Sequence, residues 1–246
     1  MTKIINRFKK EIIQAAYKAQ EGHIASAFSV LDILWVLYTL VLKKDYFVLS
    51  KGHGCLGLYA VLAEKGFFPK TWLHDFASFK SHLGGHPDAN QVPGVVASTG
   101  SLGHGLPMAV GMALGLKIKK KPNKVYCLIG DGEANEGSIW EAIMLGAHHR
   151  LDNLVCVVDY NHSTDRALAL GDLGEKFKSF GWEVEKINGH NHQEIYKALK
   201  KQSNKPLAII AETIKGYGVK EMENNPAWHH RAPNRQEMEL MLKELS

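Results

Sequence analysis

Two short polar motifs carry side chains that could hold a metal ion. A Gly-Asp-Gly turn centred on Asp131 follows one apolar run, and Asn161 follows the next apolar run along the chain. A carboxylate and an amide oxygen are hard ligands, of the kind that Mg²⁺ binds together with waters and phosphate oxygens. The motifs therefore predict a diphosphate held through a metal ion. The alternative is that Asp131 only caps a helix and Asn161 only occupies a turn.

The elements around these motifs are expected to bring both side chains to one place. Residues 124–129 and 153–158 are short runs rich in β-branched and aromatic residues, which is typical of buried parallel strands. Ligands of open α/β sheets bind at the carboxyl ends of such strands, so Asp131 and Asn161 should lie close together. The intervening residues 133–149 have helical periodicity. Their predicted apolar face consists of Trp140, Ile143, Met144 and Ala147.

The rest of the chain alternates in the same way. Further strands are expected at residues 46–49, 182–187 and 206–212. Further helices are expected at residues 3–21, 29–42, 54–65, 69–76, 102–120, 172–180, 192–203 and 235–245. This rhythm predicts an α/β fold with a parallel sheet and helices on both faces, in a single domain of residues 1–246. Residues 81–100, the link after Ser163 and a lid-like segment at residues 215–233 are expected to be loops.

Composition narrows the classes of protein. The chain has 246 residues, of which 45% are hydrophobic, enough for a sizeable core. The net charge is +5, but the densest basic run, residues 117–124, has no interleaved aromatics and predicts a solvated helix end rather than a nucleic-acid site. No apolar run is expected to approach a membrane span, so no membrane partner is predicted. Cys55, Cys127 and Cys156 lack metal-ligand spacing and indicate reduced core residues of a cytoplasmic protein.

Four of the 13 histidines stand out because each follows Gly or Trp in a predicted loop. They are His23, His53, His86 and His229. Histidine can bind sugar hydroxyls and transfer protons near neutral pH, although a lone histidine more often has a structural role. His162, beside Asn161, fits either role. A surface position on helices or turns is expected for His148, His149, His190 and His192.

The spacing of the Gly-Asp-Gly turn, a helix and a strand ending in Asn resembles the thiamine diphosphate motif. GDGEANEGSIWEA, LSKGHG and GGHPD resemble transketolases in particular. The resemblance implies thiamine diphosphate and Mg²⁺ (or Ca²⁺ or Mn²⁺) as cofactors. It implies metal ligation by Asp131, Asn161 and the carbonyl of Ser163. The implied cofactor-binding residues are His53, Gly100, Ser101, Leu102, Gly130, Asp131, Gly132, Glu133, Asn161, Ser163 and His229. The implied catalytic residues are His23, His53, His86, His229 and Glu136.

The resemblance covers the N-terminal third to half of an ordinary transketolase. It implies the N-terminal subunit of a split transketolase, which transfers a two-carbon ketol unit from a ketose phosphate to an aldose or its phosphate. The pyrimidine-binding and C-terminal domains are expected on a partner subunit, in a heterotetramer with two copies of each chain. Glu136 and Glu141 would meet that partner, unless they are only solvated helix acids. In three places the sequence departs from the family: Ile24-Ala25 replace Pro-Gly, Asp88 replaces Glu, and His230-Arg231 replace Gly-Lys.

Three alternatives stay open. The chain could be the α-type subunit of a 2-oxo acid dehydrogenase, although such enzymes need no histidines that read sugars. It could resemble a synthase of deoxyxylulose phosphate, which shares the GSLGH stretch. It could also be a subunit that binds cofactor or partner without turnover, although the intact Asp131, Asn161 and site histidines argue against decay.

Overall fold

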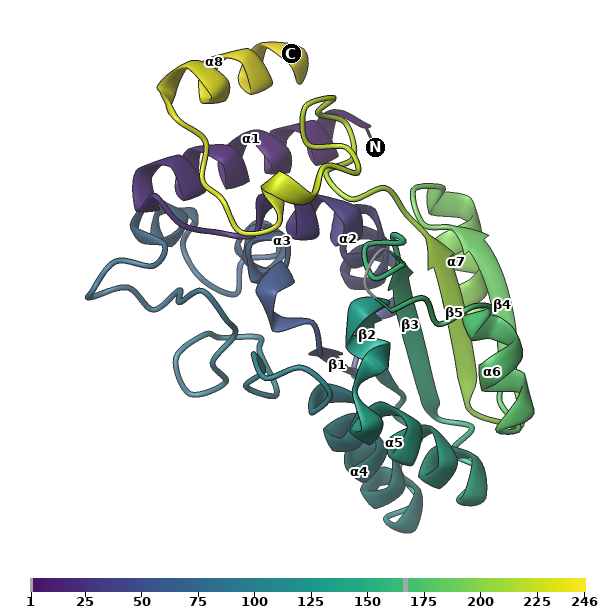
Figure 1. The fold of residues 1–246 in the computed structure, drawn as a ribbon. Helices are drawn as coiled ribbons and strands as arrows, with labels where there is room; N and C mark the ends of the chain where they lie inside the picture. Colours follow the sequence, from purple (N-terminus) through teal and green to yellow (C-terminus); the bar gives the residue numbers. More distant parts are fainter. Residues whose placement is uncertain (1, 166–167) are drawn as a thin grey trace.

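The centre of the fold is a five-stranded sheet in which every neighbouring pair is parallel (Figure 1). The structure, a computed structural model, describes residues 2–165 and 168–246. Residues 1, 166 and 167, which fall in the predicted domain and in the predicted link after Ser163, lie outside the described residues. The strands run in the order β1-β2-β3-β5-β4. They are β1 (Tyr46–Leu49), β2 (Val125–Gly130), β3 (Leu154–Tyr160), β4 (Glu183–Asn188) and β5 (Leu207–Glu212).

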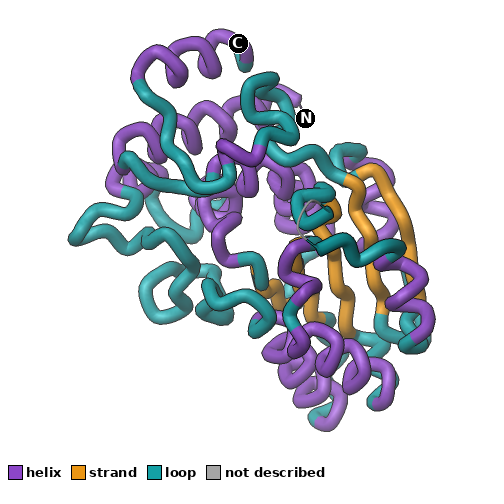
Figure 2. Tube along the Cα trace, viewed as in Figure 1, coloured by secondary structure: helices purple, strands orange, loops and turns teal. Residues whose placement is uncertain are grey.

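Helices cover both faces of the sheet, which confirms the predicted fold class (Figures 1 and 2). One face packs against α1 (Thr2–Ala19), α2 (Ile24–Val36), α3 (Cys55–Glu64) and α7 (His192–Lys200). The other face packs against α4 (Gly105–Ile118), α5 (Gly137–His148) and α6 (Leu173–Ser179). The last helix, α8 (Arg235–Glu244), lies against α1. Along β2, Leu128 belongs to the first core and Cys127 to the second, because successive strand residues point to opposite faces.

The predicted helix at residues 133–149 is interrupted near its start. A 3₁₀ turn, Gly132–Asn135, is followed by Glu136 in an extended conformation, and only then does α5 begin. The predicted apolar face was also partly wrong, because Met144 is 50% exposed. The buried face of α5 consists of Ile139, Ala142, Ile143 and Gly146.

Three other helix predictions differ from the structure. The helix expected at residues 102–120 begins only at Gly105, because Gly103 has φ of +83° and cannot continue a right-handed helix. The helix expected at residues 29–42 begins earlier, at Ile24, and ends in a π-helical turn at Leu37–Val41. The helix expected at residues 69–76 is a 3₁₀ helix, Lys70–Asp75.

The segment Ile24–Val41 is more apolar than expected. It is 18 residues long with a mean hydropathy of 2.0, long and apolar enough to cross a membrane by length and composition. The expectation that no run approaches that length was therefore wrong. In the fold, 83% of this segment is buried, as in the core helix of a soluble protein.

The predicted lid-like segment at residues 215–233 is irregular, as expected, but it is firmly anchored. It contains one short 3₁₀ helix, Pro226–Trp228. Val219, Met222 and Trp228 are each at most 1% exposed and belong to the core around α1. The segment is therefore a packed part of the wall that surrounds the strand ends rather than a loosely attached lid.

Candidate functional site

The predicted metal ligands lie together where β2 and β3 end. Gly130 pairs with Asp159 at the end of the ladder, which places Asp131 beside Asn161. Ser163 connects the two, since its Oγ donates to Asp131 Oδ1 at 3.2 Å and its N–H donates to Asn161 Oδ1 at 3.2 Å. Asp131 is 2% exposed and Asn161 is 6% exposed. The geometry therefore brings a buried carboxylate and a buried amide oxygen to one point.

This donor set fits a bound cation. Burial and the neighbouring charge of Asp159 raise the pKa of Asp131, so the ionised carboxylate lacks full compensation from the protein. A divalent cation would supply the missing charge. Among the described residues, no three His, Cys, Asp or Glu side chains are placed to share a metal ion, so a cation here would depend on amide and main-chain oxygens as well.

Asp159 is a site residue that the sequence motifs did not reveal. It is fully buried and accepts hydrogen bonds from Ser29 Oγ at 2.7 Å, Asn161 Nδ2 at 3.0 Å and Thr213 Oγ1. It also pairs with the buried ammonium of Lys51. By binding the amide nitrogen of Asn161, Asp159 turns the amide oxygen away from itself. Its position two residues before Asn161 on an apolar strand was the available signal.

A cavity of about 550 Å³ opens beside these ligands. Gly132, Asn161 and Ser163 line one side, and Lys215 and His229 line the other. A Cβ added at Gly132 would meet its nearest described neighbour only at 4.0 Å, so there is room over this glycine. The cavity is thus large enough for a small cofactor and is bordered by both the anchoring groups and a histidine.

Glu133, predicted to bind cofactor, lies under the loop that should carry the cofactor ring. Its carboxylate accepts hydrogen bonds from Ser50 Oγ, Gly103 N at 2.9 Å and Gly130 N at 3.2 Å. Burial raises its pKa. The side chain therefore fastens the ends of β1 and β2 to the loop before α4.

The loop at residues 99–103, which includes the predicted binding residues Gly100, Ser101 and Leu102, lies directly on the turn after β1. Thr99 Oγ1 donates to Leu49 O at 2.6 Å. A Cβ on Gly52 would come within 2.9 Å of Gly100 N, so only glycine allows this approach. Ser101 is exposed and Leu102 is half-buried, which leaves the loop accessible from outside.

Three of the predicted histidines form a cluster. The ring centroids of His23 and His53 are 5.1 Å apart, and those of His23 and His229 are also 5.1 Å apart. His230 joins them, stacked on His23 at 4.4 Å with an interplanar angle of 18°. The rings come from the turn before α2, the turn before α3 and the segment after β5, so only the fold brings them together.

Hydrogen bonds assign different roles to two rings of the cluster. His23 Nδ1 donates to the carbonyl of His229 at 2.7 Å, which leaves its Nε2 as an acceptor. Lys215 Nζ donates to His229 Nδ1 at 2.7 Å, which leaves the proton on Nε2 as a donor. The cluster therefore presents both a proton acceptor and a proton donor.

The cluster is neutral at physiological pH. Burial lowers the pKa of His23 to about 4, with nearby His230 and His229 adding to the shift against their own hydrogen bond. Burial and the charge of Lys51 lower the pKa of His53 to about 2. Burial also lowers the pKa of His229 and lowers that of Lys215 to about 8.

His86 and Glu136 lie at the margin of this site. A Cβ on Gly100 would lie 3.1 Å from the ring of His86, so this exposed ring covers the cofactor loop. Its charge is among those that lower the pKa of His23, which indicates that it faces the cluster. Glu136 is exposed at the start of α5, beside Gly103. The structure thus gathers His23, His53 and His229 closely and leaves Glu136 outside the histidine cluster.

Two histidines expected at the surface are buried instead. His190 Nδ1 binds Asp32 Oδ2 at 2.9 Å and His192 Nε2 binds Asp32 Oδ1 at 2.5 Å, with side-chain exposures of 7% and 16%. The surface prediction failed because their partner lies in α2, far away in sequence. His148 and His149 are exposed, as expected. His162 is exposed and bridges Asp165 and Glu212 at 2.8 and 3.0 Å.

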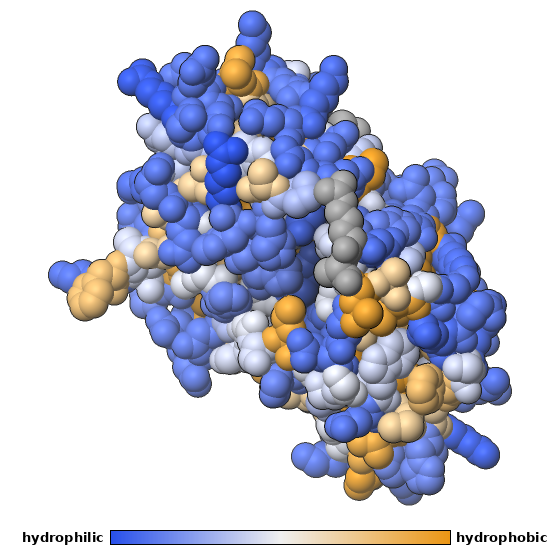
Figure 3. Space-filling model, in the orientation of Figure 1, coloured by the Kyte–Doolittle hydropathy of each residue, from blue (hydrophilic) through white to orange (hydrophobic). Residues whose placement is uncertain are grey.

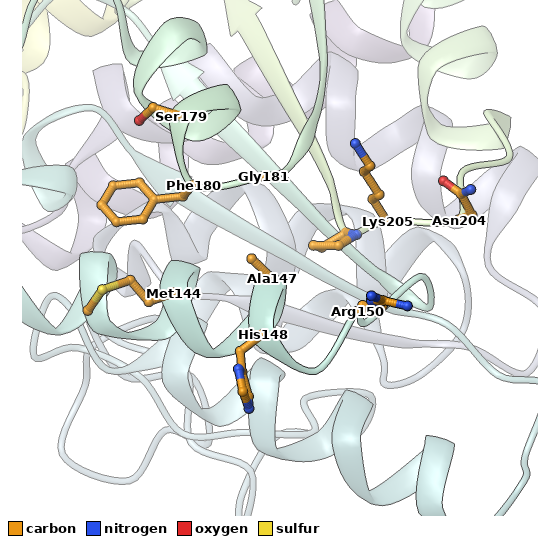
Figure 4. A pocket seen from close by; sticks show the side chains of 10 residues that line it. Met144, Ala147, His148, Arg150, Ser179, Phe180, Gly181, Asn204 and Lys205 are labelled. Atoms are coloured by element: carbon orange, nitrogen blue, oxygen red, sulfur yellow. The ribbon is translucent and has the colours of Figure 1, made fainter.

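A second hollow, of about 670 Å³, lies near the amino ends of the strands (Figure 4). It is bordered by the end of α5, the end of α6 and the segment before β5. In Figure 4 the side chains of Phe180, His148 and Arg150 point in different directions. The described residues that line this hollow do not bring their polar groups to one point, so the edge at Asp131 is the better candidate site.

The fold and the site define a class of protein: an α/β protein that binds a phosphorylated cofactor at the carboxyl ends of its strands. A family profile described as "Transketolase, thiamine diphosphate binding domain" matches residues 1–245. The chain belongs to this family.

Relatives of two lengths match the chain. It is 38% identical to the first of the named subunits of apulose-4-phosphate transketolase from Phocaeicola vulgatus, over 97% of this chain and 91% of that protein. It is also 38% identical to human transketolase, over 98% of this chain but 41% of that protein. The solved transketolase of Campylobacter jejuni superposes with a TM-score of 0.91 at 31% identity, over 99% of this chain and 42% of that one. The chain thus spans about two fifths of these longer transketolases.

Proposed function

We propose that this chain is the N-terminal subunit of a split transketolase, which transfers a two-carbon ketol unit from a ketose phosphate to an aldose or aldose phosphate. The observation that carries the proposal is the neutral cluster of His23, His53 and His229 beside the anchoring pair Asp131 and Asn161. The family itself supplies the thiamine diphosphate-binding domain. The similarity to named transketolase subunits, almost from end to end, supports the split arrangement.

The anchoring groups would hold the cofactor through Mg²⁺. Asp131, the amide oxygen of Asn161 and the carbonyl of Ser163 would bind the metal, and the metal would bind the diphosphate. Lys215, on the opposite side of the cavity, adds a positive charge that favours an anionic group. Thiamine diphosphate, when bound, supplies the carbon nucleophile and the electron sink for the two-carbon unit.

The histidines would handle the protons of the sugar. The free Nε2 of His23 can accept a hydrogen bond or a proton from a hydroxyl, and the Nε2–H of His229 can donate to a carbonyl or alkoxide oxygen. Because burial keeps the rings neutral, both functions are available at the same pH. This pairing suits a reaction that deprotonates one sugar oxygen and protonates another.

A partner subunit would complete the site with the pyrimidine-binding domain, in a cytoplasmic heterotetramer. An exposed apolar surface on α4 and α5 supports the presence of a partner (Figure 3). Met108 and Ile118 of α4 are 37% and 72% exposed, and Met144 and Leu145 of α5 are 50% and 51% exposed. Exposed apolar groups of this kind on adjacent helices are typical of protein interfaces.

The test compares the chain alone with the chain co-expressed with the product of the neighbouring gene. Ketol transfer is measured with thiamine diphosphate, Mg²⁺ and several ketose phosphates. Activity only in the pair is expected. Activity of the isolated chain would contradict the split enzyme, and binding of cofactor without transfer by the pair would favour a binding subunit or another thiamine enzyme. The variant Asp131→Asn is expected to lose cofactor affinity, whereas Asp152→Asn on the distant surface is the control.

A further inference from the structure

A buried aspartate–histidine pair lies directly behind the strand end that leads to Lys215. Asp32 of α2 accepts a hydrogen bond from His190 Nδ1 at 2.9 Å, and His190 Nε2 accepts one from the N–H of Ile214 at 2.9 Å. Both side chains are at most 7% exposed. Because Nδ1 donates and Nε2 accepts, the ring is fixed as one neutral tautomer.

The surroundings of His190 leave it little room to move. The ring of Tyr217 stacks on it with centroids 3.7 Å apart and an interplanar angle of 22°. The ammonium of Lys9 lies 4.6 Å above the Tyr217 ring and is itself only 2% exposed. Asp32, in turn, is held by a second hydrogen bond from His192. The ring is therefore enclosed by α1, α2 and the segment after β5.

The main chain around Lys215 is held on both sides. The N–H of Ile214, just before it, donates to His190, and the N–H of Gly216, just after it, donates to Ala25 O at 3.0 Å. Lys215 itself is 6% exposed. Two hydrogen bonds from outside the cofactor cavity thus set the point from which the Lys215 side chain extends.

The position of Lys215 determines the state of His229. The bond from Lys215 Nζ to His229 Nδ1 is 2.7 Å long, and a displacement of about 1 Å would break it. The other charges that act on Lys215 are those of Lys51, Asp131 and Asp159, and none of them replaces this bond. Without it, His229 could carry its proton on either nitrogen.

We propose that His190, oriented by Asp32, is a positioning residue of the ketol-transfer site. It binds the N–H of Ile214, places Lys215 and thereby fixes the tautomer of His229. The proposal rests on the proposed function for its catalytic consequence, but it concerns a residue that touches neither substrate nor cofactor. The link from Asp32 to Lys215 is itself a property of this chain alone.

The test uses two variants of His190 and needs no activity for its first measurement. His190→Phe keeps the ring that stacks on Tyr217 but removes both nitrogens. His190→Gln retains an acceptor for Ile214. In the isolated chain at pH 7, ¹⁵N chemical shifts of the imidazoles report the tautomer of His229. The fixed Nε2–H tautomer is expected in the wild type and in His190→Gln, and a mixture of tautomers is expected in His190→Phe. His148→Phe, on the exposed end of α5, is the matched control and should leave His229 unchanged.

The second measurement follows the enzyme assembled with its partner. Misplacement of Lys215 should lower kcat roughly 10- to 100-fold in His190→Phe, with much less effect in His190→Gln. An unchanged His229 tautomer in a folded His190→Phe chain overturns the proposal, whatever the activity. Loss of the tautomer in both variants also overturns it, because glutamine keeps the acceptor. A tautomer that responds as expected in a wild-type chain without ketol transfer would support the positioning role and contradict the proposed function instead.

Discussion

Lys51 and Asp159 form an ion pair with side chains that are 2% and 0% exposed. Asp159→Asn would leave the Lys51 ammonium buried without its carboxylate, which should lower the free energy of unfolding by about 3–5 kcal/mol. Urea denaturation of the isolated chain measures this loss. The exposed pair of Lys117 and Asp152 gives the control, since Asp152→Asn should cost less than about 1 kcal/mol. An equally small loss for Asp159→Asn would contradict its role as the counter-charge of Lys51.

The buried histidines should make the protein sensitive to acid. The folded-state pKa of His23 is about 4 and that of His53 is about 2, against 6.5 in the unfolded chain. The unfolded chain therefore binds more protons below pH 6.5, so the stability present above pH 6.5 is lost as the pH falls towards 4 and further towards 2. Urea midpoints at pH 7.5 and pH 5 measure the loss. His53→Gln should flatten this dependence, whereas His148→Gln should not.

Local sequence was sufficient for the residues at strand ends. Asp131, Asn161 and Ser163 follow apolar runs, so the sheet itself brings them together, and the structure places them within hydrogen-bonding distance. The pairs that orient them were missed for a physical reason. Asp32 and His190 are 158 positions apart, and nothing in either local pattern indicates the partner. Such pairs depend on tertiary packing, which local periodicity does not contain.

At the scale of elements, the loop before α4 depends on one glycine. Gly103 has φ of +83°, and an added Cβ would lie 2.5 Å from Ser138 Oγ. Gly103→Ala should therefore destabilise the chain by about 1–3 kcal/mol and weaken cofactor binding, because the loop must shift. Gly111→Ala in α4, where no described atom would lie within 4 Å of the new Cβ, should instead stabilise the isolated chain by about 0.5–1 kcal/mol. Thermal melts of both variants check the contrast, and equal effects would show that the left-handed turn is unimportant.

Element boundaries were predicted less well than element types. The strand at residues 46–49 is found as predicted, and the other strands shift by one or two residues at an end. The helix at residues 133–149 was predicted too long, because its periodicity continues through Glu136. Hydrogen bonds from Ser50 and Gly103 hold the side chain of Glu133 back towards the strand ends, in a 3₁₀ turn ahead of α5. Tertiary contacts at the site thus accompany the departure from the pattern.

At the scale of the whole molecule, the exposed face of α4 and α5 should determine assembly. Leu145→Glu places a charge among apolar side chains and should raise the Kd for the partner subunit at least about tenfold. Its effect on the isolated chain should be small, because Leu145 is 51% exposed. Leu240→Glu on α8, 59% exposed beside a different surface, is the control. Light scattering after size-exclusion chromatography gives the result, and equal assembly of both variants would place the interface elsewhere.

The three free cysteines give the molecule a built-in clock for its own opening. Cys127 and Cys156 face each other in register across β2 and β3 and are fully buried, while Cys55 lies at the start of α3 with its thiol on Gly85 O at 3.0 Å. Burial raises the pKa of all three thiols, so an alkylating reagent meets little thiolate until the chain opens. The labelling rate at Cys55 would then report excursions of the loop that carries His86. The rate at the strand pair would report rupture of the sheet. One mass spectrum over time would separate the breathing of the site from the lifetime of the fold.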